Sequence, residues 1–259
     1  MKSFLIGSLP HKNVEEALEY TFSFDIPTLP TLPNIDPNEF MVDQALCELD
    51  GFEYIRHGLR DKNTVYNSSL RFAAREFFFK RAGNKEYKWQ ASGPLTLMSS
   101  LDHHPQTKNI LDLYFDKLVK TQAEFNRLSK GKTFFFLDEP VLAFSEESMG
   151  LLEKFLCRLK ENSAFKDIVF GLHACSKARA EALRNLSFDL FALDSSLYDK
   201  SEWKQLQAEL GKRLIFIPVT SKGESTGHPR GQEAFASSSC GLALTSLERL
   251  GAVHKNLNF

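Results

Sequence analysis

The sequence predicts an α/β fold in which eight parallel strands close into a (β/α)8 TIM barrel. Short apolar runs alternate with amphipathic stretches along most of the chain. Continuously apolar strands between helices are typical of a parallel sheet that helices cover. Counting a proline-rich second strand gives eight strand–helix units, which is the number that closes such a barrel. We therefore expect residues 1–259 to form a single barrel domain.

The first third of the chain is expected to supply two strands, over residues 3–9 and 26–33, and two helices, over residues 14–20 and 37–49. Asn13 is placed to cap the first helix, because its side chain can accept hydrogen bonds from the helix N-terminus. Three prolines between Ile26 and Pro33 exclude a helix and favour extended backbone. Pro37, directly after Asp36, is tolerated in the first turn of the second helix.

The stretch from residue 51 to residue 88 fits no regular unit. Phe52 to Arg56 alternate weakly between apolar and polar residues, as an edge strand does. Ser68 or Ser69 can cap a helix that ends near Gly83. We interpret residues 51–88 as an insertion after the second strand, or as a cap over one end of the barrel.

The rest of the chain has a regular rhythm. It predicts strands over residues 88–92, 133–137, 168–172, 190–193, 214–219 and 234–238, and helices over residues 105–128, 146–160, 178–186, 201–210 and 244–250. Gly93 and Pro94 break the strand over residues 88–92, and Gly211 ends the helix over residues 201–210. In the helix over 105–128, apolar residues recur at helical spacing.

The composition is ordinary for a globular protein, apart from 23 phenylalanines, and the formal net charge is -1. This charge gives no electrostatic reason to expect a nucleic acid or an anionic membrane as partner. The apolar run Phe4-Leu5-Ile6 is too short for a signal peptide, and no segment has the length of a membrane span. Four cysteines without a tight pairing pattern favour a reducing compartment. We expect a cytoplasmic protein.

Polar and metal-binding residues gather at the ends of the predicted strands: Ser8, Gly93-Pro94, Asp138-Glu139, His173 with Cys175, Asp194, Thr220-Ser221 and Cys240. In parallel barrels the active site lies at the C-terminal ends of the strands. Side chains alternate along a strand, so His173 and Cys175 project from the same face. An imidazole beside a thiol is half of a zinc site, although both residue types also occur in plain cores.

Cys240 follows the last predicted strand, which is adjacent to the first strand in a closed barrel. With His173 and Cys175 it makes a Cys₂His set that suits zinc. Asp194, one strand beyond the pair, is the candidate for a fourth ligand, and forming a strand-end turn is its alternative role. A fourth protein ligand would give a closed structural site, whereas water or substrate in that position would give a catalytic one.

Six short segments, in order along the chain, resemble landmarks of the catalytic domain of the cobalamin-independent methionine synthase family: Ile6-Gly7-Ser8, Gly93-Pro94-Leu95-Thr96, Leu137-Asp138-Glu139-Pro140, His173-Ala174-Cys175, Ala192-Leu193-Asp194 and Cys240-Gly241-Leu242. That family belongs to the uroporphyrinogen decarboxylase-like barrel superfamily. The resemblance implies a zinc ion with four protein ligands: His173, Cys175, Cys240 and, where the family has glutamate, Asp194. In the family, zinc activates a thiol such as homocysteine for methyl transfer.

The resemblance also implies where the substrate binds. In the family, the first-strand Ile-Gly-Ser segment and the Asp of Asp-Glu-Pro hold the amino acid. The matching positions are Ile6, Gly7, Ser8 and Asp138, with Glu139 beside it. The Asp138 carboxylate could pair with a substrate ammonium group, and a structural, hydrogen-bonded acid is its alternative role. The implied partners are a small-molecule thiol and a corrinoid or folate methyl donor.

The chain departs from the family at two landmarks. The acidic His-Gly-Glu segment after the second strand has no counterpart, and residues 26–33 occupy its place. Thr220-Ser221-Lys222 stands where the family carries His-Ser-Pro. The full-length synthases have a further N-terminal domain, and the short, barrel-only relatives resemble this chain more. Two alternatives remain open: a barrel that binds zinc or a small ligand without turnover, and an enzyme like uroporphyrinogen decarboxylase, which has no need of His173 and Cys175.

Overall fold

The computed structural model describes residues 3–49, 52–55, 58–61, 68–101, 107–140, 145–194 and 197–217. The predicted strand at 234–238, the predicted helix at 244–250 and Cys240 lie outside the described residues. Among the helices of the described stretches, none is both long enough and apolar enough to cross a membrane.

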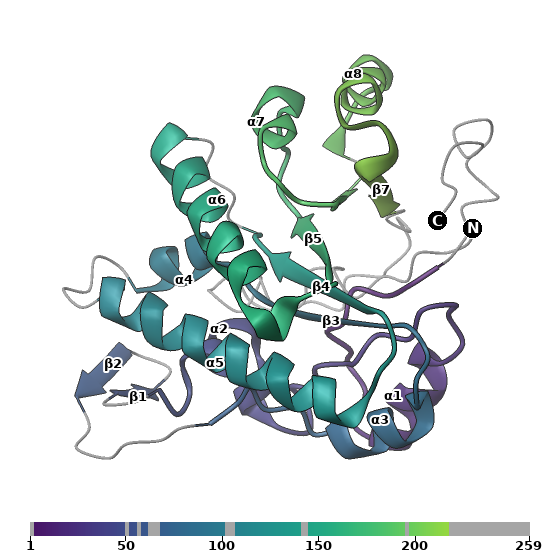
Figure 1. The fold of residues 1–259 in the computed structure, drawn as a ribbon, viewed down its shortest axis with the longest axis vertical. Coiled ribbons are helices and arrows are strands. Elements are labelled where there is room, and N and C mark those ends of the chain that lie inside the picture. Colours follow the sequence, from purple (N-terminus) through teal and green to yellow (C-terminus); the bar gives the residue numbers. More distant parts are fainter. Residues whose placement is uncertain are drawn as a thin grey trace, which may run out of the picture.

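The main sheet holds five parallel strands, whose order in space follows their order in the chain (Figure 1). They are β3 (Tyr87–Ser92), β4 (Thr133–Asp138), β5 (Val169–Ala174), β6 (Leu190–Asp194) and β7 (Leu214–Ile217). Helices connect consecutive strands. The predicted α/β fold with parallel strands is therefore confirmed. Strand β5 runs beyond its predicted end, so His173 lies within the strand.

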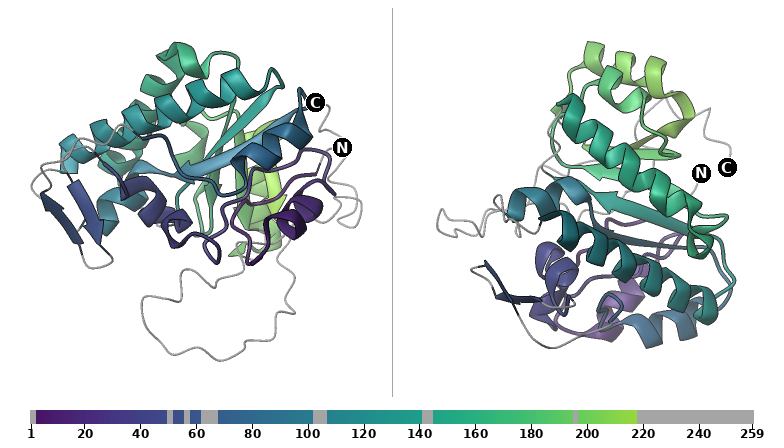
Figure 2. Two further views of the ribbon diagram at one scale, coloured as in Figure 1. Left: turned by 90° about the horizontal axis from the view of Figure 1, so that it is seen from below. Right: turned by 60° about the vertical axis from the view of Figure 1, so that its left-hand side comes forward.

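The N-terminal segment continues this sheet beyond β3, although it forms isolated bridges rather than full strands. Thr28 pairs in parallel with Lys88 of β3, and Ser8 pairs in parallel with Thr31. The prolines of residues 26–33 lack the N–H that a ladder needs, which explains why no continuous strand forms there. Figure 2 shows this segment, in purple, alongside β3.

The described α-helices are α1 (Val14–Thr21), α2 (Met41–Leu46), α3 (Arg75–Ala82), α4 (Pro94–Ser100), α5 (Thr107–Leu128), α6 (Glu146–Glu161), α7 (Ala180–Arg184) and α8 (Lys200–Leu210). Helices α5 and α6 run side by side over the sheet (Figure 1), and the rings of Phe115 and Phe155 meet between them. Asn13 caps α1 as predicted, since its side chain accepts from the N–H of Glu15 at 2.8 Å. Gly211 closes α8 with a φ of 53°, in the left-handed region that favours glycine.

One predicted helix is wrong, and one helix was not predicted. The helix expected over residues 37–49 is divided, because Phe40 adopts an extended conformation between a 3-10 turn at Pro37–Glu39 and α2. Strand β3 ends at Ser92, so the predicted break at Gly93 and Pro94 is confirmed. The sequence did not predict α4, which begins directly after the break with Pro94 in its first turn.

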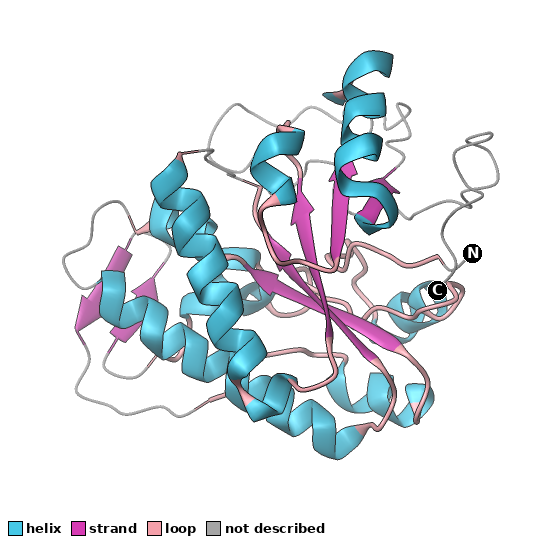
Figure 3. Cartoon of the chain, turned by 45° about the horizontal axis from the view of Figure 1, so that its top comes forward, coloured by secondary structure: helices cyan, strands magenta, loops and turns pink. Residues whose placement is uncertain are grey.

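The region interpreted as an insertion, residues 51–88, contains a hairpin and a helix. Strands β1 (Phe52–Ile55) and β2 (Gly58–Asp61) pair in antiparallel fashion as a separate sheet. This hairpin stands apart from the main sheet in Figure 3. Helix α3 begins later than either predicted serine cap, and the Ser69 hydroxyl donates instead to Glu124 of α5 at 2.9 Å.

Side chains of the sheet divide between two faces. On β4, Phe135 and Leu137 join the large core beneath the helices, whereas Phe134 and Phe136 belong to a separate inner cluster. This inner cluster consists of Phe4, Ile6, Ile26, Phe134, Phe136, Leu190 and Ala192. The rings of Phe4 and Phe136 lie 5.4 Å apart. The inner face of the sheet therefore packs against the N-terminal segment.

Glu39 fastens the proline-rich segment to the residues before α3. One carboxylate oxygen accepts from the backbone N–H of Leu32 at 2.6 Å, and the other accepts from the backbone N–H of Ala73. The side chain is fully buried. Burial raises the pKa of the Glu39 carboxyl to about 7, although the two N–H donors oppose this shift.

We expect the free energy of unfolding to fall as the pH rises from about 5 to about 7, in part because of Glu39. Its folded-state pKa of about 7 exceeds the ordinary 4.5, so the folded protein binds this proton more tightly than the unfolded chain. That contribution is lost as the pH rises through the folded-state pKa. In Glu39→Gln the free energy of unfolding should fall by about 2 kcal/mol less over the same pH range, as measured by urea unfolding at each pH. Equal slopes in the two proteins would contradict the prediction.

Candidate functional site

Buried polar side chains lie on the inner face of three consecutive strands, among them Lys88 and Gln90 of β3, Asp138 of β4 and His173 of β5. In the sheet register, Asp138 lies opposite Ser92 of β3 and opposite His173. Asp138 and His173 therefore form the C-terminal layer of the inner face, whereas Gln90 and then Lys88 lie progressively deeper.

His173 and Cys175 lie side by side at the end of β5, as predicted. Atom Nε2 of His173 is 3.0 Å from Sγ of Cys175. Atom Nδ1 is 3.2 Å from the carbonyl oxygen of Ala192, which can only accept a hydrogen bond. The proton is therefore assigned to Nδ1, and the lone pair of Nε2 faces the sulfur. Burial lowers the pKa of His173 to about 4, so the imidazole is neutral at neutral pH.

This pair fits one side of a zinc site. With the usual zinc–nitrogen and zinc–sulfur distances, tetrahedral ligands of these two types lie about 3.5 Å apart, so His173 and Cys175 would separate by about 0.5 Å. A zinc-binding histidine commonly donates its other N–H to a carbonyl, as His173 does to Ala192. Cys175 is disulfide-bonded in the structure, and a thiolate ligand requires the reduced residue.

The described residues supply only part of the predicted zinc set. Asp194 ends β6 and is half-buried, and Cys240 lies outside the described residues. Within the described stretches, no group of three or more His, Cys, Asp or Glu side chains could hold a metal ion. The part of the set that the structure brings together is the His173–Cys175 pair.

Asp138 carries an unpartnered atom in this layer. Its Oδ2 accepts a hydrogen bond from Nε2 of Gln90 at 2.7 Å, whereas its Oδ1 is buried without a hydrogen-bond partner. Burial raises the pKa of Asp138 to about 7, and the charge of Lys88 opposes this shift. An unsatisfied buried carboxylate oxygen is costly, so Oδ1 marks a position where the donor group of a ligand could bind.

The Ile6-Gly7-Ser8 segment is largely engaged within the fold. Ile6 belongs to the inner apolar cluster, and the backbone N–H of Gly7 donates to Oε1 of Gln90 at 2.8 Å. A Cβ on Gly7 would lie 3.2 Å from Cδ of Gln90, so glycine permits this close approach. Ser8, which pairs with Thr31, is exposed and is the member of the segment whose side chain faces solvent.

Glu139 caps α4 from the end of β4. Its Oε1 accepts from the backbone N–H of Leu95 at 2.9 Å, and its Oε2 accepts from the N–H and the hydroxyl of Thr96 at 2.8 and 2.6 Å. Burial raises the pKa of Glu139 to about 7, and these donors oppose the shift. A Cβ on Gly93 would lie 2.1 Å from Oε1, so glycine is required beside this carboxylate. Both oxygens are therefore engaged inside the protein.

Lys88 and Gln90 were not identified as site residues from the sequence, although the alternation of polar and apolar residues in β3 could have indicated them. In this strand the polar residues Lys88, Gln90 and Ser92 alternate with the aromatic and apolar residues Tyr87 and Trp89, and every position is buried. Alternation on a half-exposed strand separates solvent from core. On a fully buried strand it indicates a polar interior, which is the feature that the structure places beneath Asp138.

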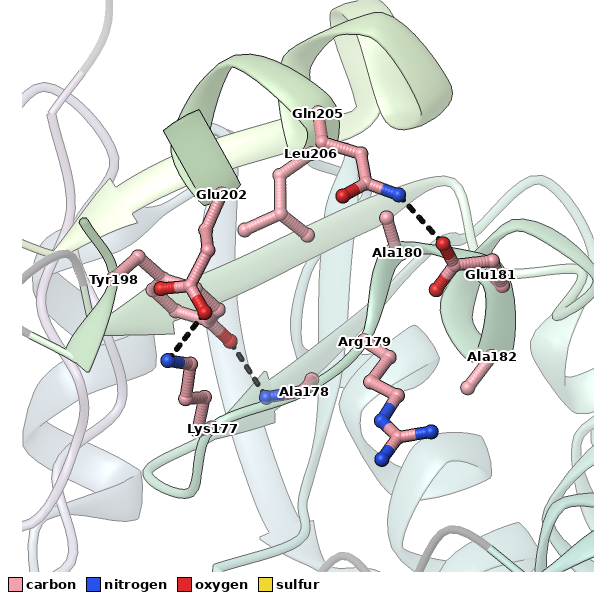
Figure 4. A pocket seen from close by; sticks show the side chains of 10 residues that line it. All are labelled: Lys177, Ala178, Arg179, Ala180, Glu181, Ala182, Tyr198, Glu202, Gln205 and Leu206. Carbon is pink, nitrogen blue, oxygen red and sulfur yellow. Dashed lines mark hydrogen bonds and ion pairs between the residues drawn. The ribbon is translucent and has the colours of Figure 1, made fainter. Parts of the chain in front are cut away.

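A surface hollow of about 860 Å³ lies between α7 and α8 (Figure 4). Its polar groups are largely paired with one another: Lys177 bonds to Glu202 at 2.5 Å, and Gln205 donates to Glu181 at 2.5 Å. The hydroxyl of Tyr198 accepts from a backbone N–H at 2.7 Å. These paired groups contrast with the unpartnered buried oxygen on the inner face, so we place the candidate site at the inner face.

No protein-family model matches this chain, and no curated protein matches it. His173 and Cys175 are the residues that the sequence predicted together and that the structure places in contact.

Proposed function

We propose that this chain is a zinc-dependent methyltransferase of the methionine-synthase type, which transfers a methyl group to a thiol such as homocysteine. The observation that carries the proposal is the 3.0 Å approach of His173 Nε2 to Cys175 Sγ at the end of a parallel strand. Zinc, when bound, lowers the pKa of a thiol, so that a thiolate is available at neutral pH.

The proposed zinc ligands are His173, Cys175, Cys240 and Asp194. The hydrogen bond to Ala192 supports the role of His173, because it fixes the ring and leaves Nε2 unprotonated. The need for a thiolate at Cys175 favours a cytoplasmic location, where thiols are kept reduced.

We further propose that the sheet closes into a (β/α)8 barrel of the type found in uroporphyrinogen decarboxylase and methionine synthase. The parallel bridges of the N-terminal segment add two positions to the sheet in chain order. The inner cluster supports closure, because it unites Phe4 near the N-terminus with Leu190 of β6. In a closed barrel all strand ends converge on one mouth, which would bring Cys240 toward the His173–Cys175 pair.

The thiol substrate would lie over the layer formed by Asp138 and His173. There the unpartnered Oδ1 of Asp138 would accept a hydrogen bond from the ammonium group of an amino-acid substrate. The thiolate sulfur supplies the electron pair of the new bond to the methyl carbon. The bond between that carbon and the donor, a corrinoid or a folate, breaks and leaves its electron pair on the donor.

The first test is the zinc content of the reduced protein, measured by plasma mass spectrometry after dialysis. We expect about one zinc ion per chain, which is lost in Cys175→Ser and in Cys240→Ser. Cys157→Ser is the matched control, because Cys157 is a free cysteine on α6 and should leave the metal content unchanged. A wild-type protein that binds no zinc overturns the proposal.

The second test is transfer of a methyl group from methylcobalamin or methyltetrahydrofolate to homocysteine, followed as the appearance of methionine. Turnover that disappears when zinc is removed supports the methyltransferase. Zinc binding without turnover from either donor supports the non-catalytic barrel instead. A metal-free native protein leaves the decarboxylase-like alternative.

A further inference from the structure

Lys88 places a cation on the inner face, beneath the layer of Asp138. Only 1% of the side chain is exposed, and Nζ lies 4.9 Å from the ring centroid of Phe136 and 5.8 Å from that of Phe4. Its ammonium group donates to Oε1 of Gln90. Burial lowers the pKa of Lys88 to about 7, and the attraction of Asp138 opposes this shift.

The Gln90 amide links Lys88 to Asp138 in one defined orientation. Its oxygen accepts from two donors, the backbone N–H of Gly7 at 2.8 Å and the ammonium group of Lys88. Its NH₂ group must therefore face the other way, and it donates to Oδ2 of Asp138 at 2.7 Å. Because Oδ2 is occupied in this way, Oδ1 is the oxygen that remains for a ligand.

The charges on this face constrain what can bind there. The amide dipole of Gln90 points its oxygen at Lys88 and its NH₂ at Asp138, an alignment that favours a positive lysine and a negative aspartate. His173 adds no charge when its Nδ1–H donates to the carbonyl of Ala192 and its Nε2 lone pair faces Cys175, so these two charges cancel. A ligand that brings only an ammonium group would leave a buried positive charge uncompensated, which is costly. A ligand that brings an ammonium group and a carboxylate would not.

We propose that Lys88 and Gln90 are positioning residues of the substrate site: through the Gln90 amide, Lys88 holds Asp138 with Oδ1 free, and its charge makes the site favour the zwitterionic end of an amino acid over a simple amine. This inference rests on the proposed function for the nature of the substrate, but it does not depend on zinc. Neither residue needs to touch the reacting atoms.

The test compares L-methionine with 3-(methylthio)propylamine, which has the same thioether and amine but lacks the carboxylate. Isothermal titration calorimetry gives both dissociation constants, and neither ligand needs a thiol or a metal. We expect the wild-type protein to bind L-methionine about tenfold more tightly than the amine. In Lys88→Met this preference should disappear, because the amine then compensates the charge of Asp138. Lys88→Arg keeps the cation and should keep the preference.

Lys117→Met is the matched control. Lys117 of α5 is also buried, but it donates to the backbone carbonyl of Cys47, outside the inner face. Its replacement should leave the ratio of the two dissociation constants unchanged. Gln90→Leu removes the link to Asp138 and should weaken both ligands by a similar factor.

The outcomes separate a positioning role from a structural one. An equal loss of affinity for both ligands in Lys88→Met, an unchanged ratio, or a wild-type protein that binds neither ligand would each overturn the proposal. If Lys88→Met does not fold, Lys88→Gln replaces it, because glutamine removes the charge and keeps a hydrogen-bond donor. If the protein binds no zinc but Lys88→Met changes the ratio of the two dissociation constants, the methyltransferase proposal is contradicted and this inference is supported. If the protein binds zinc but the ratio is unchanged, the methyltransferase proposal is supported and this inference is contradicted.

Discussion

Replacing Glu139 by alanine is expected to lower the free energy of unfolding by about 3–5 kcal/mol. The N–H of Leu95 and the N–H and hydroxyl of Thr96 would lose their shared acceptor. Each buried donor left unsatisfied costs about 1–3 kcal/mol. The Glu139 side chain is fully buried, at 0% exposed, so bulk water does not already compete for these donors. Urea unfolding followed by circular dichroism measures the loss.

Glu139→Gln is the graded control for this prediction. The amide keeps one acceptor oxygen but turns an NH₂ group toward a donor of α4, so we expect about half of the alanine effect. Asn13→Ala, which removes the exposed cap of α1, should cost about 1 kcal/mol. If Glu139→Ala costs no more than that exposed cap, the hydrogen bonds to α4 are not needed for stability, and Glu139 becomes the stronger candidate for binding substrate.

Replacing Gly171 by alanine should lower the free energy of unfolding by about 3 kcal/mol. Gly171 lies in β5 opposite Phe136 of β4, and a Cβ there would lie 2.3, 2.4 and 2.5 Å from three atoms of the Phe136 ring. Ring and strand are both buried, so neither can move away without disturbing the inner cluster. The glycine is therefore required by the space that the phenylalanine fills.

A double substitution tests this cause directly. Adding Phe136→Leu to Gly171→Ala should recover part of the loss, so that the two changes together cost less than the sum of the single changes by about 1–2 kcal/mol. Gly150→Ala is the control, because Gly150 lies within α6 and a Cβ there meets nothing within 4 Å. It should stabilise the helix by about 0.5–1 kcal/mol. Simple additivity of the two inner-face changes would show that the ring does not cause the loss.

The parallel strands and their order could be predicted because their signals are local. An apolar run such as Phe134 to Leu137, between two amphipathic helices, indicates a covered parallel strand wherever it lies. Helix α4 could not be predicted in this way, because Pro94 serves equally as a strand breaker and as a first-turn residue. The choice depends on Glu139, which comes much later in the chain and satisfies the N–H groups of the new helix.

The residues of the candidate site also differ in whether a local sequence pattern could predict them. The shared face of His173 and Cys175 could be predicted from their spacing of two residues, although Cys175 lies just beyond the end of β5. The link from Lys88 through Gln90 to Asp138 requires knowing the register of β3 against β4 and which of their faces is the inner one. Hydrogen bonds between side chains of different strands therefore could not be predicted from the pattern of residues along the chain.

The order of β3 to β7 also bears on how the protein is made. Each of β4, β5, β6 and β7 pairs with the strand that precedes it in the chain, so a strand leaving the ribosome meets a partner that has already been synthesised. The sheet can then grow from one side, with a single moving edge of unpaired backbone. Such an edge is the surface on which strands of other nascent chains would add, and growth in chain order keeps it short-lived.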